Sequence, residues 1–159
     1  MTETEGVQRA RAALEASGIA HRITVSTERA SSLAEAAAQR GIEPGDIVKS
    51  LVVRRGAGDY VFVLVPGDRE ISWPKLRAHL GVNRLSMPPA DKARDATGYE
   101  RGTITPFGST TAWPVIIDTT VAGRTISMGA GAHGTSVSLA ADDLVRALAA
   151  EVADVTDPT

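Results

Sequence analysis

Two short apolar runs, separated by a glycine-containing pentapeptide, constrain the fold of this chain more than any other feature. The first covers residues 47–54 (IVKSLVVR) and the second covers residues 60–65 (YVFVLV). The five residues between them, RGAGD, are rich in turn-forming types. Two β-type runs on either side of such a turn are typical of an antiparallel hairpin. We therefore expect a hairpin in the middle of the chain.

Helices and further short strands are predicted on both sides of this hairpin. Helical spacing, capping residues and glycine stops predict helices at residues 4–17, 31–41, 73–80, 89–96 and 140–152. Strand patterns occur at residues 20–25, 83–87, 115–118, 124–130 and 135–139. Residues 97–114 have neither period, and a long irregular loop within a compact domain is often functional.

This element order predicts the fold class. Six or seven short strands, with helices at the start, middle and end, favour an α+β fold with a mixed, mostly antiparallel sheet that is curled and barrel-like. A parallel, doubly wound sheet is less expected because hairpins dominate the middle. The 159 residues are 43% hydrophobic, enough for one core, so we expect a single domain over residues 1–159.

The composition excludes several classes of protein. The net charge of -2 excludes binding to nucleic acid by bulk charge, so we expect no DNA partner. The chain has no cysteine, which excludes disulfides and thiolate nucleophiles. The three histidines, at positions 21, 79 and 133, show no metal-ligand spacing, and we expect no metal and no cofactor. Lacking a signal-peptide pattern and any membrane-length apolar run, the sequence favours a cytoplasmic protein with no membrane partner.

Lys49 is the unusual residue of the first strand. The chain has 14 Arg and 3 Lys, and this lysine shares a strand face with Ile47, Leu51 and Val53. Its stem could simply cover apolar surface while the amine reaches water. Alternatively, a partly desolvated ammonium could supply a fixed positive charge for an oxyanion, a phosphate or a ribose hydroxyl.

The irregular loop contains the G-x-x-x-P segment Gly102, Thr103, Ile104, Thr105 and Pro106. Glycine permits a backbone conformation closed to other residues, and proline biases its predecessor toward an extended geometry. Main-chain N–H groups held rigidly between them could bind an oxyanion or a carbonyl. A plain surface turn is an equally acceptable reading of so short a motif.

Taken together, these segments resemble the YbaK/EbsC family, which is related to the editing domain inserted in bacterial prolyl-tRNA synthetase. The resemblance rests on DIVKSLVV, VLVPGD, KLRAHLG, TGYERGTITPFG, IID, MGAGAHG and LAADDLVRAL, in this order. It extends from about residue 5 to residue 155. The lysine strand and the G-x-x-x-P loop are its most specific parts.

The resemblance implies a freestanding aminoacyl-tRNA deacylase that hydrolyses the ester of mischarged tRNA, in many such proteins a proline tRNA. It implies Lys49 as the essential charged group and residues 102–106 as the pocket loop, with water or a substrate group as the nucleophile. Mischarged aminoacyl-tRNA is the implied partner, and prolyl-tRNA synthetase could supply the affinity that a net charge of -2 does not. The alternative is a binding or regulatory module that recognises an amino acid, a nucleotide or a protein without turnover.

Further residues have both a functional and a structural interpretation. His133 lies in a glycine-rich turn where related domains can carry a pocket histidine. Ser136 stands where members acting on cysteinyl-tRNA carry an acidic residue, which puts cysteine specificity in doubt and is consistent with another small amino acid. Tyr99 and Phe107 could stack on an adenine or anchor the loop. Arg101, with other arginines, could guide the RNA end or be ordinary surface charge.

Overall fold

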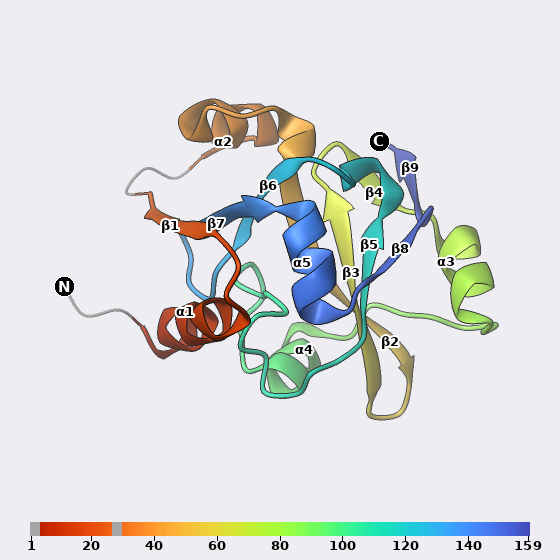
Figure 1. Cartoon of the computed structure of the whole chain (residues 1–159). Coiled ribbons are helices and arrows are strands. Elements are labelled where there is room, and N and C mark those ends of the chain that lie inside the picture. The colour runs from red at the N-terminus through yellow and green to blue at the C-terminus, as the bar shows by residue number, and fades with distance from the viewer. Residues whose placement is uncertain (1–3, 27–29) are drawn as a thin grey trace.

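The computed structural model describes residues 4–26 and 30–159, and its architecture is shown in Figure 1. The α-helices of this part of the chain are α1 (Glu5–Ser17), α2 (Leu33–Arg40), α3 (Trp73–Leu80), α4 (Ala90–Thr97) and α5 (Ala141–Leu148). Its strands are β1 (His21–Val25), β2 (Ile47–Gly56), β3 (Asp59–Pro66), β4 (Arg69–Ile71), β5 (Val115–Asp118), β6 (Thr125–Gly129), β7 (Thr135–Ala140), β8 (Glu151–Ala153) and β9 (Thr156–Pro158). This part of the chain therefore combines helices with a mixed sheet, in agreement with the predicted fold class.

Capping residues set the helix ends as the sequence predicts. Thr4, Ser32 and Ser72 each accept a hydrogen bond from a main-chain N–H of the first turn of α1, α2 and α3. Glycines with left-handed backbone conformation end the same three helices. These local signals explain why the predicted bounds of α1, α2 and α3 agree with the structure to within a residue or two.

The central sheet is mixed, and its edges do not meet. In the described residues its strand order is β1-β7-β6-β2-β3-β5-β8. β2 and β3 form the predicted antiparallel hairpin, and β6 and β7 form a second antiparallel pair. The pairs β2–β6, β3–β5 and β5–β8 are parallel. The predicted mixed sheet is confirmed, but it is an open sheet rather than a closed barrel.

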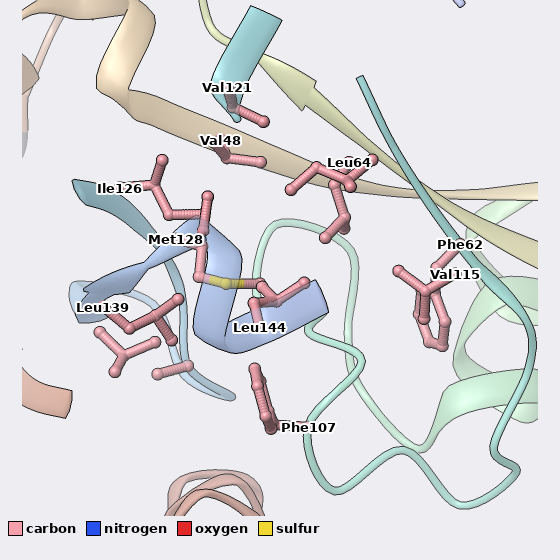
Figure 2. Packing of buried hydrophobic residues seen from close by; sticks show 14 of the residues in the cluster. Val48, Phe62, Leu64, Phe107, Val115, Val121, Ile126, Met128, Leu139 and Leu144 are labelled. Carbon is pink, nitrogen blue, oxygen red and sulfur yellow. The ribbon is translucent and has the colours of Figure 1, made fainter. Parts of the chain in front are cut away.

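Apolar side chains pack on both faces of the sheet. On one face, Phe62 and Leu64 of β3 pack with Met128 of β6 and Leu144 of α5 (Figure 2). On the other face, Val61, Val63 and Val65 of β3 belong to a second cluster with Leu76 of α3 and Val155. Strand alternation explains the division, because successive residues of β3 point to opposite faces. Figure 1 shows α5 crossing in front of β3 and α3 lying beside β8 and β9.

The structure differs from the sequence prediction in two regions. Residues 83–87 do not form a named strand and make only an isolated bridge, between Ser86 and Arg54 of β2. The predicted C-terminal helix over residues 140–152 ends at Leu148, because Ala149 adopts a left-handed conformation. The following residues form β8, which pairs with β5, and β9, which pairs with β4. None of the helices in the described residues is long and apolar enough to span a bilayer.

Candidate functional site

β2 and β6 pair only at the first residues of β2, and a cavity lies where the two strands diverge. Their parallel pairing is restricted to Ile47 with Ser127 and Val48 with Met128. Beyond this point lies a cavity of about 490 Å³, which we call the β2-edge cavity. Such a volume lies within the range of roughly 300–1,000 Å³ that is usual for small-molecule sites. Its described lining comes from residues 47–52, from 128, 129, 132, 134 and 135, from 101, 102 and 104, from 87, 88, 90 and 93, and from Arg40.

The edge of β2 that faces this cavity is unpaired. The main-chain oxygen of Ile47 accepts a hydrogen bond from Gly67, so the odd-numbered residues of β2 turn their main-chain groups toward β3. The even-numbered residues turn theirs the other way: Val48 pairs with β6, and Arg54 exchanges hydrogen bonds with Ser86. Between these two, no described strand pairs with Ser50 and Val52. Their N–H and C=O groups therefore remain available on the cavity side of β2.

The side chain of Ser50 is also unpartnered. Its hydroxyl oxygen is buried, and no other described residue forms a hydrogen bond with it. An isolated buried hydroxyl is unfavourable unless a bound molecule or water satisfies it. Ser50 lines the cavity. Its hydroxyl is therefore a buried polar group beside the cavity that the described residues leave without a partner.

Positive charge gathers around the cavity. Lys49, Arg40 and Arg101 contribute to its lining, which contains no carboxylate among the described residues. Arg40 donates to the hydroxyl of Ser127 at 2.8 Å, and burial lowers the pKa of its guanidinium below the usual value. An arrangement of cations without matching carboxylates favours an anionic ligand or a transition state that develops negative charge.

Lys49 lines the cavity, but it is more exposed than the sequence predicts. Its face of β2 packs through Leu51 and Val53 into the second core cluster, as strand alternation requires. The side chain of Lys49 itself is exposed, and its Nζ donates to the main-chain oxygen of Arg69, 3.2 Å away on β4. Of the two interpretations that the sequence leaves open, the structure favours the one in which the stem covers apolar surface and the amine reaches water. The amine is therefore exposed and bonded to the main chain rather than enclosed in the cavity.

The G-x-x-x-P loop contributes to the cavity at alternate positions. Gly102 and Ile104 line it, whereas Thr103, Thr105 and Pro106 are buried behind them. Gly102 has a φ of +89°, which explains the need for glycine. The N–H of Thr103 donates to the main-chain oxygen of Glu100 at 2.9 Å, so this amide is not free. Of the five loop residues predicted to bind a ligand, Gly102 and Ile104 are placed to touch one in the cavity.

Aromatic residues anchor the loop rather than line the cavity. Tyr99 is 1% exposed, and its hydroxyl donates to the main-chain oxygen of Phe107 at 2.6 Å. Phe107 belongs to the core cluster that also contains Leu144 (Figure 2). Arg9 of α1 lies over the Tyr99 ring, 4.5 Å from its centroid, and donates to the main-chain oxygens of Gly98 and Gly108. The anchoring interpretation of both aromatics is therefore the one that the packing supports.

His133 and Ser136 differ in their position relative to the cavity. The imidazole Cε1 of His133 is 3.2 Å from the position that a Cβ on Gly102 would occupy, so this exposed side chain borders the cavity. Ser136 is buried in β7 and is not part of the described lining, which Thr135 joins instead. Successive strand residues point to opposite faces of the sheet, which explains why Thr135 lines the cavity and Ser136 does not. Ser136 is therefore not placed to contact a ligand in this cavity.

Comparison with known proteins places these features in a family context. A sequence model of the aminoacyl-tRNA editing domain matches residues 27–147. The proline–tRNA ligase of Thermosipho melanesiensis is 38% identical over 84 residues, which are 53% of this chain and 15% of the ligase. EbsC of Enterococcus faecalis, a proposed Cys-tRNA(Pro)/Cys-tRNA(Cys) deacylase, is 28% identical over 117 residues, 73% of this chain and 71% of that protein. The chain therefore spans a small part of the ligase.

Two solved structures share the fold over nearly the whole chain. A proposed trans-editing enzyme for prolyl tRNA synthetase superposes with a TM-score of 0.89 at 25% identity, covering 98% of this chain and 99% of that one. The hypothetical protein APE2540 superposes with a TM-score of 0.85 at 26% identity, covering 94% of this chain and 99% of that one. The open sheet and its surrounding helices are thus an arrangement that these proteins have in common.

Proposed function

The chain belongs to the aminoacyl-tRNA editing domain family, and from this premise we propose that it hydrolyses the ester bond of a mischarged aminoacyl-tRNA. The observation that carries the proposal is the β2-edge cavity, which combines Lys49, Arg40 and Arg101 with an unpaired strand edge. Such a cavity suits the 3′-terminal aminoacyl adenosine, which presents phosphate, hydroxyl, carbonyl and amino groups together. We further propose a proline tRNA as the carrier, because the relatives' names refer to this tRNA.

The proposed chemistry needs no nucleophile from the protein. Water adds to the acyl carbon, the carbonyl oxygen becomes an oxyanion, and the ribose oxygen leaves with a proton. The ester of an aminoacyl-tRNA is already activated, so holding it in place beside positive charge can accelerate this reaction. Lys49 supplies the charge, while main-chain donors on the edge of β2 and near Gly102 hold the substrate.

The hydrogen bond from Lys49 Nζ to the main-chain oxygen of Arg69 must break before the amine can contact a substrate. A hydrogen bond such as the one from its Nζ to the Arg69 oxygen contributes only about 1 kcal/mol to stability. The lysine stem is long and flexible, and its three donors can be redirected at little cost. We infer that a substrate phosphate or carbonyl oxygen replaces the Arg69 oxygen when it enters the cavity.

The size of the acyl group is limited by main chain rather than by specific side chains. Gly102, Gly129, Ala132 and Gly134 are among the residues that line the wall. Residues without long side chains present a rigid surface that excludes bulky ligands sterically. This supports a small amino acid, such as alanine, serine or threonine, as the acyl group that is removed.

A panel of mischarged proline tRNAs tests the proposal. Alanyl-, seryl-, cysteinyl- and prolyl-tRNA(Pro) are incubated with the protein, and the loss of the ester is followed over time. We expect hydrolysis of at least one of the first three and little hydrolysis of the last. Lys49→Ala should lower kcat by at least about 100-fold, the loss usual for removing one stabilising donor, with an unchanged circular dichroism spectrum.

Two further results decide between the proposal and its alternative. Arg146→Ala is the control, because it removes an exposed cation of α5 that lines neither the cavity nor the loop, and it should retain activity. Full activity of Lys49→Ala would refute the assigned role of this lysine. If all the tRNAs are bound but none is hydrolysed, the protein is a binding module rather than an enzyme.

A further inference from the structure

A second hollow adjoins the β2-edge cavity. It has a volume of about 690 Å³ and lies between the tip of the β2–β3 hairpin and α4. Met87 and Pro88 belong to the lining of both hollows, so they form the ridge between them. We call this second hollow the hairpin groove. Its volume also lies within the range of roughly 300–1,000 Å³ that is usual for small-molecule sites.

The ridge is held in place by main-chain bonds. Ser86, the residue before it, donates to the main-chain oxygen of Arg54 at 3.2 Å and accepts from its N–H at 2.8 Å. Pro88 and Pro89 stiffen the segment that leads into α4. Met87 is nevertheless 47% exposed, an unusual position for a large apolar side chain. The ridge is thus a fixed, partly apolar surface that opens on both sides.

The groove presents aromatic rings and cations together. The rings of Tyr60 and Trp113 meet edge to face with centroids 5.2 Å apart, and the Trp113 indole N–H donates to the Ala96 oxygen at 2.8 Å. Arg54 and Lys92 line the same groove with exposed side chains. Asp95 is the one carboxylate among its described lining residues. Rigid aromatic surface combined with positive charge is how proteins bind single-stranded nucleic acid.

We propose that the hairpin groove binds the single-stranded nucleotides that precede the terminal adenosine of the tRNA. This inference rests on the proposed function, since it requires the aminoacyl adenosine to occupy the β2-edge cavity. The strand would then cross the ridge of Met87 and Pro88, with Arg54 and Lys92 near its phosphates and with apolar surface beneath its bases. Continuity with the cavity and the excess of cations favour RNA over a peptide as the occupant.

Substrates of different length test this inference. The first substrate is 3′-alanyl adenosine, which fills only the cavity, and the second is the same ester on a CCA trinucleotide. Arg54→Glu and Lys92→Glu reverse exposed charges of the groove, and Arg146→Glu is the matched control on α5. Each groove variant should lower kcat/KM for the trinucleotide by about tenfold, the loss expected for a charged hydrogen bond, and leave the adenosine ester unaffected. The control should affect neither.

A binding measurement makes the test independent of turnover. Fluorescence anisotropy of a labelled, uncharged RNA ending in CCA should show weaker binding to both groove variants than to the unmodified protein and the control. If the variants weaken binding but no ester is hydrolysed, the groove assignment stands and the deacylase proposal fails. Equal losses on the adenosine ester and the trinucleotide, unaltered RNA binding in the variants, or no RNA binding at all would overturn the groove assignment.

Discussion

At the scale of single residues, Ser50 is the residue of the cavity wall whose side chain the described packing does not explain. Its buried hydroxyl has no partner among the described residues, and Ser109 is the other side chain in this condition. The two serines differ in location, because Ser50 lines the cavity and Ser109 does not. A buried hydroxyl without a hydrogen-bond partner does not stabilise the fold, so packing alone does not explain why a serine stands at position 50.

Replacing each serine by alanine separates binding from folding. Neither Ser50→Ala nor Ser109→Ala should lower the free energy of unfolding, because no hydrogen bond is lost and a buried polar group is removed. Ser50→Ala should lower kcat/KM for an aminoacyl ester by about fivefold to tenfold, the worth of one hydrogen bond, and Ser109→Ala should not. Urea denaturation and steady-state kinetics check the two effects. Unchanged kinetics in Ser50→Ala would exclude its hydroxyl from substrate binding.

Gly102 offers a second test at this scale. Its φ of +89° makes Gly102→Ala strained, and the added Cβ would stand 3.2 Å from the His133 ring. Gly123 has a comparable φ of +76° and open space around it, so Gly123→Ala carries the same backbone strain without the crowding. Both variants should lose about 1–2 kcal/mol of stability in chemical denaturation. Only Gly102→Ala should also lose deacylation activity at a temperature where both are folded; equal activities would place the loop outside the site.

The candidate site was only partly predictable from the residues. Lys49 and Gly102 stand in motifs that the sequence singles out, and both are among the residues that line the cavity. Arg40 and Ser50 were missed, since nothing local distinguishes an arginine at a helix end or a serine in a strand. They meet at the cavity because β6 pairs with the start of β2 and then diverges from it, a long-range feature without a sequence signal.

At the scale of elements, Asp118 fastens the C-terminal strands to the sheet. This carboxylate, at the end of β5, is fully buried and accepts hydrogen bonds from the N–H groups of Val155 and Thr120 and from the Thr120 hydroxyl. Arg69 of β4 lies 3.9 Å away and also bonds Thr156 of β9. Burial alone would raise the pKa of Asp118, but these hydrogen bonds outweigh it and hold the pKa below the usual value.

The lowered pKa of Asp118 predicts a pH dependence of stability. A carboxylate with a depressed pKa in the folded state stabilises the protein above its unfolded pKa of about 3.9, and this stabilisation is lost as the pH falls through the folded value. Asp118→Asn should therefore lower the free energy of unfolding at pH 7 by about 2–3 kcal/mol, since charged hydrogen bonds are lost. The difference from the unmodified protein should narrow below pH 4. A constant difference across pH 3–7 would contradict this account.

The end of α5 explains why the sequence prediction failed there. Residues 140–152 have the composition of a continuous helix, yet Ala149 adopts a φ of +51° and the chain turns into β8. A three-residue strand such as β4, β8 or β9 has no periodicity to detect, and it forms only because a partner is already in place. The elements with caps, glycine stops or a hairpin turn were those that could be predicted.

Glycine substitutions at this helix end test the explanation. Ala149→Gly should raise the free energy of unfolding by about 1 kcal/mol, because glycine adopts the left-handed conformation without steric cost. Ala147→Gly, two residues earlier on the exposed side of α5, should lower it by about 1 kcal/mol through lost helix propensity. Thermal denaturation compares the pair. If both variants are destabilised equally, Ala149 is not a strained helix terminus.

At the scale of the whole molecule, charge is distributed unevenly. The described linings of the β2-edge cavity and the hairpin groove contain five basic residues and one acidic residue. The chain as a whole has 17 basic and 19 acidic residues, which leaves 12 basic against 18 acidic elsewhere. A surface with this excess of acidic groups repels a polyanion. The resemblance to the YbaK/EbsC family is confirmed by the domain match, but this distribution becomes visible only in the fold.

The uneven charge predicts that the protein contacts the 3′ CCA end of the tRNA and makes few contacts with the rest of the molecule. With the same acyl group, kcat/KM for the full tRNA(Pro) ester and for the CCA trinucleotide ester should agree to within about tenfold. Each phosphate contact adds roughly -0.7 to the slope of log affinity against log salt for single strands. The two substrates should therefore show similar slopes when kcat/KM is measured at several salt concentrations. A slope steeper by 2 or more for the full tRNA would mean that phosphates of the acceptor stem contact a basic surface outside the two hollows, and the protein would then bind tRNA without help from a synthetase.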